Sequence, residues 1–134
     1  MAVSSIKVSF SCDVKKVWDT VTSLEEYSWR SDLNRIEVIG NDQFIEYTKG
    51  GYPTTFTVTV SEPYQRWEFD MDNGNMKGHW TGIFTQADGK TVLKCTETVI
   101  PKKVFMKPFV SMYLKKQQAL YIADLKKVLE EEKR

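Results

Sequence analysis

The chain has 134 residues, enough for one domain with a real hydrophobic core. Hydrophobic residues make up 41% and charged residues 28%, which excludes a disordered chain, and a net charge of +1 gives no electrostatic reason to expect nucleic acid as a partner. No stretch approaches the ~20 apolar residues that cross a bilayer, and residues 1–10 lack the features of a secretory signal. We therefore expect one cytoplasmic domain, residues 1–134.

The amino-terminal part predicts a strand followed by short helices. Residues 3–12 alternate apolar and polar side chains, the period of a half-buried strand. Asp13 supplies an N-cap for a short helix, in which Trp18 and three valines recur at helical spacing. Ser23 is placed to cap a second short helical turn over residues 23–27.

The middle of the chain predicts an antiparallel meander. Turn-forming residues such as Asn73-Gly74 and Asp88-Gly89 separate segments that are rich in β-branched and aromatic residues. Gly78 and Gly82 lie inside one of these segments, where glycines mark a bulge or sharp curvature. The predicted strands cover residues 35–39, 43–49, 54–62, 65–71, 76–86 and 91–100.

A long carboxy-terminal helix completes the chain. Residues 102–133 are helical in composition, with Pro108 marking a kink or a restart. Their apolar positions, among them Phe105, Phe109 and Met112, form one wide stripe. Such a stripe needs a broad apolar surface opposite it, and the concave face of a curved sheet is the obvious partner. With helices only at the ends, the elements indicate an α+β fold.

Aromatic side chains of the strands and the last helix are candidates to line an apolar cavity. For residues 76–86, alternation leaves the inward face undecided, and we choose the face that carries Trp80 and Phe84 because these side chains are larger. The predicted lining residues are Trp67, Phe69, Trp80, Phe84, Phe109, Tyr113, Gln117 and Tyr121.

Three polar residues fall among these apolar positions. Gln117 and Asp124 are either structural, as a satisfied core amide and a partner of a cation, or they orient the polar group of a ligand. Alternation places Glu97 in a mostly apolar set, where a carboxylate must be paired, hydrogen-bonded or protonated. Glu97 and Asp124 are therefore weak candidates for acid/base catalysis, unless Glu97 lies at an edge or out of register and faces water.

The sequence offers little for other chemistry. His79 is the only histidine, so no metal site of several histidines exists, and we expect no metal and no cofactor. His79 lies on the face opposite Trp80, which suggests the convex side of the sheet. Cys12 and Cys95 have no metal or redox spacing and are interpreted as buried, inert thiols. No nucleophile elbow, phosphate loop or dinucleotide fingerprint is present.

The order of elements and the aromatic residues resemble the START-like (SRPBCC) superfamily, in its polyketide cyclase/dehydrase and lipid transport branch. The resemblance is carried by residues 6–10, 13–22 and 24–32, where Tyr27 and Trp29 stand one residue closer than in the family pattern. It implies a helix-grip fold: a curved seven-stranded antiparallel sheet, two short helices closing one end, and a long C-terminal helix across an apolar cavity. The superfamily shares no functional residue set that could be transferred.

Three functions are compatible with the sequence. The first is binding or transport of a small hydrophobic ligand, a lipid or a polyketide-like molecule, and it is favoured over an enzyme. The second is a cyclase or dehydratase that uses a buried carboxylate. The third is a protein-interaction or co-chaperone module, which would need an exposed apolar patch. The sequence shows no long exposed apolar run, which weighs against the third.

Overall fold

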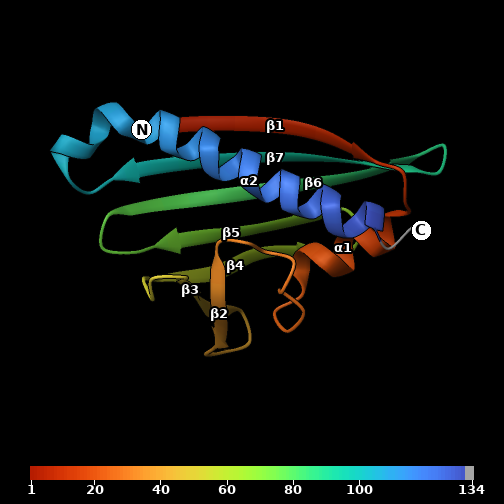
Figure 1. Ribbon diagram of the computed structural model, residues 1–134, viewed down its shortest axis with the longest axis horizontal. Helices are drawn as coiled ribbons and strands as arrows, with labels where there is room; N and C mark the ends of the chain where they lie inside the picture. Colours follow the sequence, from red (N-terminus) through yellow and green to blue (C-terminus); the bar gives the residue numbers. More distant parts are fainter. Residues whose placement is uncertain (132–134) are drawn as a thin grey trace.

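The computed structural model describes residues 1–131 and contains one curved sheet with a long helix across it (Figure 1). The α-helices α1 and α2 and the short 3₁₀ helix η1 join or follow the strands. The elements in chain order are β1 (Ala2–Phe10), α1 (Val14–Thr22), β2 (Leu33–Val38), β3 (Gln43–Thr48), β4 (Pro53–Glu62), β5 (Arg66–Asp72), β6 (Met76–Ala87), β7 (Lys90–Pro101), η1 (Val104–Phe109) and α2 (Val110–Glu131).

All seven strands form one antiparallel sheet in the order β1-β7-β6-β5-β4-β3-β2. The strands β2 to β7 therefore follow one another as hairpins, while β1 lies beside β7 at the far edge. The link through α1 carries the chain from one edge of the sheet to the other. Figure 1 shows the sheet curving beneath α2, which crosses one face diagonally. The expected seven-stranded helix-grip architecture is confirmed.

The amino-terminal helix α1 begins where the sequence predicts. The Asp13 carboxylate accepts a hydrogen bond from the Lys16 amide at 3.1 Å, and the apolar side of α1, including Trp18, is buried. The second helical turn predicted for residues 23–27 is absent; this segment is an irregular loop. The Ser23 hydroxyl still accepts hydrogen bonds from the backbone amides of Glu25, at 3.4 Å, and Glu26, at 3.0 Å. It therefore caps a single turn that does not continue into a helix. The second short helical element is η1.

The glycines of β6 do not mark a bulge. Pairing of β6 with both neighbours is continuous, and the register shifts lie in β4, between Val58 and Val60, and in β2. At Gly82 a Cβ atom would lie 2.5 Å from the Trp80 ring. The indole of Trp80 lies over this position and leaves no room for a side chain. At Gly78 a Cβ atom would lie 2.8 Å from the Thr98 carbonyl oxygen.

The core lies between the concave face of the sheet and the two α-helices. Its members are buried apolar residues that share the inward face of their elements, and α2 contributes Leu114, Ile122, Leu125 and Leu129. The Gln118 amide of α2 is buried and bonds twice to Ser4 of β1, donating to its carbonyl at 3.0 Å and accepting from its hydroxyl at 2.8 Å. These contacts fix α2 along the edge formed by β1 and β7. The predicted end of the last helix, beyond residue 131, lies outside the described residues.

Candidate functional site

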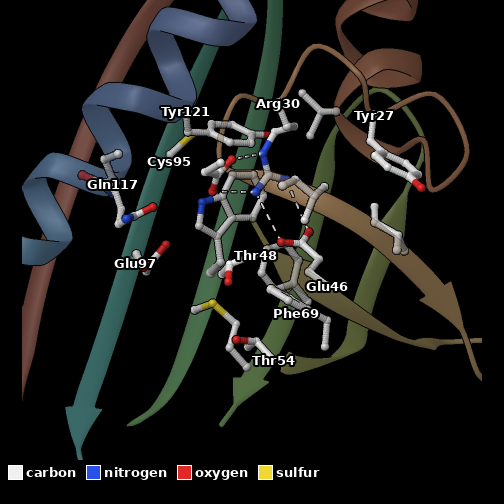
Figure 2. Close-up of a pocket in the computed structure, with 18 of the residues that line it drawn as sticks. Tyr27, Arg30, Glu46, Thr48, Thr54, Phe69, Cys95, Glu97, Gln117 and Tyr121 are labelled. Atoms are coloured by element: carbon white, nitrogen blue, oxygen red, sulfur yellow. Dashed lines mark hydrogen bonds and ion pairs between the residues drawn. The ribbon is translucent and has the colours of Figure 1, made fainter. Parts of the chain in front are cut away.

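A cavity of about 470 Å³ lies between α2 and the concave face of the sheet. Figure 2 shows side chains from α2, β3, β5, β7 and the loop after α1 converging on it. Six of the eight residues expected to line a cavity do so: Trp67, Phe69, Trp80, Tyr113, Gln117 and Tyr121.

The inner wall of the cavity is aromatic. The rings of Phe69 and Trp80 stack with centroids 5.0 Å apart, and Trp67 meets both edge-on, at 5.1 Å and 6.1 Å. Phe44 and Phe56 stack beside them at 5.0 Å. Because aromatic packing of this kind is rigid, the wall offers a preformed apolar surface to a ligand.

Glu97 of β7 lies on the inward face, opposite Trp80 in the register, as alternation predicts. Its side chain makes no hydrogen bond and no ion pair with the described residues. Burial, together with the charge of Glu46, raises the pKa of this carboxyl group to about 7. Near neutral pH, Glu97 therefore exists as both the acid and the carboxylate, so it can donate or accept a hydrogen bond or a proton inside the cavity.

Polar side chains stand close to Glu97 at the outer part of the cavity. The Gln117 side chain points into the space beside Glu97 (Figure 2), and its amide group makes no hydrogen bond to the described residues. Tyr113 is half exposed, and burial together with Glu97 raises the pKa of its phenol. The interpretation of Gln117 as a satisfied core amide is wrong, because the neighbouring Gln118 has that role. Glu97, Gln117 and Tyr113 form the polar group of the cavity.

Arg30, in the loop after α1, forms a half-buried charge cluster with Asp32 and Glu46 that sequence reasoning missed. Its guanidinium lies 3.2–3.3 Å from both Asp32 and Glu46, and it packs over the Tyr121 ring at 5.3 Å from the centroid. Burial opposes the charge of Arg30, but Glu46 and Asp32 outweigh it and raise its pKa above the ordinary range. The guanidinium therefore donates to two carboxylates, and its positive charge is neutralised by them. The sequence signal was weak, since a polar loop with Arg and Asp is typical of a solvated turn.

Two predicted lining residues lie elsewhere. Phe84 is buried under α1, its ring 5.0 Å from that of Trp18, because α1 covers the end of the sheet to which Phe84 belongs. Phe109 is 61% exposed and does not line the cavity. It belongs to η1, where Pro108 interrupts the α-helix, so the 3.6-residue period used for the stripe does not hold there. The prediction of both residues as cavity lining is wrong.

Asp124 also lies outside the cavity. Its carboxylate accepts two hydrogen bonds from Ser31, one from the amide and one from the hydroxyl, both at 2.8 Å. Asp124 therefore fixes the loop after α1 against α2 and is not available as an acid or base in the cavity. Of the two roles that the sequence allows, the structural one is present, but the partner is Ser31 and not a Lys or Arg.

The remaining chemical candidates carry no catalytic arrangement. Cys12 is half-buried and Cys95 is buried, and burial raises the pKa of the Cys95 thiol to about 12. His79 lies on the outer face between Asp70 at 2.6 Å and Glu68 at 2.7 Å; although burial opposes it, these hydrogen bonds raise its pKa. Residues 1–131 contain no cluster of three or more metal-ligating side chains. Within the same range, no helix has the length and apolar character needed to cross a membrane.

A curved antiparallel sheet that holds a long helix over an apolar cavity defines a START-like, helix-grip protein. A model of the family described as polyketide cyclase/dehydrase and lipid transport matches residues 1–130, and the chain belongs to this family. A search of curated proteins finds no match to this chain.

Solved structures share the same fold at low sequence identity. A START superfamily protein from Mycobacterium smegmatis has a TM-score of 0.88 at 12% identity, over 98% of this chain and 99% of that one. A conserved protein from Geobacillus kaustophilus has a TM-score of 0.82 at 14% identity, over 96% and 95% of the two chains. DynU16, from the dynemicin biosynthetic locus, has a TM-score of 0.76 at 17% identity, over 97% of this chain and 48% of its own. At these identities the similarity shows the fold alone.

Proposed function

We propose that this protein binds a small, largely apolar molecule in the cavity, as a carrier or receptor. The observation that carries the proposal is the aromatic wall of Trp67, Phe69 and Trp80 facing an open volume of about 470 Å³. Removing apolar ligand surface from water supplies the affinity, at about 25 cal/mol per Å² before the costs of binding are subtracted. The family to which the chain belongs includes lipid transport in its description.

The charged groups inside the cavity favour a neutral ligand with a hydroxyl or carbonyl group, because the other cation of the lining, Lys49, is exposed at the turn between β3 and β4. Arg30 is already neutralised by Glu46 and Asp32, so it offers little to an anionic head group. Glu97 and Gln117, without partners among the described residues, supply a hydrogen-bond donor and an acceptor. A ligand carboxylate would be placed beside Glu97 and would force that group to hold its proton.

The first experiment is native mass spectrometry of the purified protein beside its denatured solvent extract. We expect a discrete apolar molecule in the native ion that is released on unfolding. If the protein is isolated empty, displacement of the neutral dye Nile red by dodecanol and by dodecanoate tests both the cavity and the head-group preference. Dodecanol should compete more strongly than dodecanoate, and more so as the pH rises above 7 and Glu97 ionises.

Two matched variants locate the binding. Glu97→Gln should keep Nile red binding and weaken the preference for dodecanol, because it removes the negative charge that disfavours a carboxylate and keeps the shape of the side chain. Ile83→Ala, on the exposed outer face of β6, should change neither. Absence of any bound extract, of dye binding and of a melting-temperature shift with either probe would refute the binding proposal.

A second candidate function rests on the pKa of Glu97, which suits proton transfer near neutral pH. In this alternative, the Glu97 carboxylate takes a proton from a carbon next to a ketone; the C–H electron pair passes into an enolate, and the proton returns to either end. The test is deuterium exchange next to the carbonyl of benzylacetone, followed by NMR. Exchange faster than in buffer that is lost in Glu97→Gln would support an enzyme of the cyclase or dehydratase kind. Equal rates would leave the protein a binder.

The location and partners inferred from the sequence remain proposals. We expect a cytoplasmic protein of one domain that has no nucleic-acid partner. Cell fractionation and a gel-shift assay with duplex DNA and RNA test the location and the absence of a nucleic-acid partner.

A further inference from the structure

An exposed apolar patch covers η1 and the first turns of α2. It consists of Val104, Phe105, Phe109 and Met112, whose exposed fractions are 76%, 72%, 61% and 59%. Monomeric proteins rarely leave several large apolar side chains exposed side by side without a use for them. The sequence-based argument against an exposed apolar surface is therefore wrong for this segment, because Pro108 and the 3₁₀ turn rotate these side chains away from the core.

The same segment is strongly basic, although the whole chain is nearly neutral. Residues 98–123 include five lysines and no acidic residue, whereas the net charge of the chain is +1. Lys102 is bound to Asp72 at 2.6 Å. The other four lysines make no ion pair with the described residues; they are Lys103, Lys107, Lys115 and Lys116. Lys115 and Lys116 border a shallow groove together with Met112, so charge and apolar surface are adjacent.

The patch adjoins the outer part of the cavity. Tyr113 and Gln117 are four residues apart, so they lie along one side of α2, and Phe109 ends η1 directly before that helix. Phe109 is exposed outside the cavity, Tyr113 is half exposed and lines it, and Gln117 lies inside. In Figure 1, η1 lies at the left end of the molecule, the same end as the turn between β3 and β4. Lys49 and Gly50 of that turn line the cavity as well.

We propose that this patch docks the protein on the surface of an anionic lipid bilayer. The apolar side chains enter the boundary between head groups and acyl chains, and the four lysines reach the phosphate level. A second copy of the chain is a poorer occupant, because face-to-face pairing would bring the four lysines of one copy against the same four of the other. Docking in this orientation turns the Tyr113 side of the cavity toward the membrane. Because the patch lies outside the cavity, docking on the bilayer is expected whether or not the cavity holds a ligand.

The test is flotation of the full chain with vesicles, comparing phosphatidylcholine alone with an equal mixture of phosphatidylcholine and phosphatidylglycerol. We expect binding to the mixed vesicles, and its loss at high salt. The double variant Lys103→Glu/Lys107→Glu should bind at least about 25-fold more weakly, from roughly fivefold per lysine. Phe105→Ser should weaken binding at least about tenfold, because an inserted aromatic side chain returns to water. All replaced side chains are exposed, so folding is preserved.

Matched controls separate the patch from overall charge and hydrophobicity. Lys90→Glu/Lys94→Glu makes the same charge change on exposed lysines at the β6–β7 hairpin, and Val38→Ser removes an exposed apolar side chain from β2. Both should bind like the unchanged protein. Three results would overturn the proposal: no binding to mixed vesicles, equal weakening by the two lysine pairs, or a dimer in gel filtration that Phe105→Ser dissociates.

Discussion

Replacing Glu97 by glutamine should make the protein more stable at alkaline pH. Folding raises the pKa of this carboxyl group from 4.5 to about 7, chiefly through burial and secondly through Glu46. The folded state therefore holds the Glu97 proton more tightly than the unfolded state does. The stability associated with this group is fully present below about pH 4.5 and is lost progressively as the pH rises toward 7. Glutamine keeps the shape of the side chain and removes the ionisation.

The size of the effect follows from the pKa difference. A pKa that moves from 4.5 to about 7 disfavours the folded state by about 3 kcal/mol once the pH is above 7. At about pH 5 the ionisation of Glu97 destabilises the folded state by roughly 1 kcal/mol or less. The free energy of unfolding of Glu97→Gln, minus that of the unchanged protein, should therefore grow by about 2 kcal/mol between about pH 5 and about pH 8.

Urea denaturation followed by tryptophan fluorescence at several pH values measures this difference. His79 also has a raised pKa and loses its contribution as the pH rises, but it is present in both proteins, so its effect cancels in the comparison. Glu62→Gln, at an exposed position, is the matched control and should show a difference that does not change with pH. If the difference between Glu97→Gln and the unchanged protein is equally flat, Glu97 is not the half-buried, unpaired carboxyl group assigned here.

Other perturbations test the surroundings of the cavity by urea denaturation. Arg30→Met should cost about 2–3 kcal/mol, because it leaves Glu46 half-buried beside Asp32 without a cation. Adding Glu46→Met should recover part of that loss; additive effects would contradict the coupling. Gly82→Ala should cost about 1–3 kcal/mol and change Nile red affinity, since its Cβ must displace the Trp80 ring; unchanged stability would mean that the ring moves freely. Asp124→Ala removes two hydrogen bonds to the loop after α1 and should cost about 1–2 kcal/mol; a changed pH dependence of ligand binding would instead place it in the site.

The sequence by itself determined the order of elements. Period-two alternation in β4 and β7, the Asp13 cap and the turn residues between strands are local signals, and each strand is found within two residues of its predicted bounds. The inward position of Glu97 also followed from alternation, because a strand has only two faces and one of them must be buried. Most of the aromatic wall could be named for the same reason.

Tertiary structure decided which apolar residues face open space and which fill the core. Phe84 has the same inward face as Trp80, but only the three-dimensional arrangement shows that α1 covers the first and leaves the second beside the cavity. The Arg30 cluster depends on a contact between a loop and a strand sixteen positions apart, which no local pattern reveals. Likewise, Phe109 is exposed because the helix axis restarts after Pro108, and a helical projection assumes one continuous axis. Periodicity specifies a face within one element, whereas a cavity, a charge cluster and an exposed patch depend on how separate elements meet.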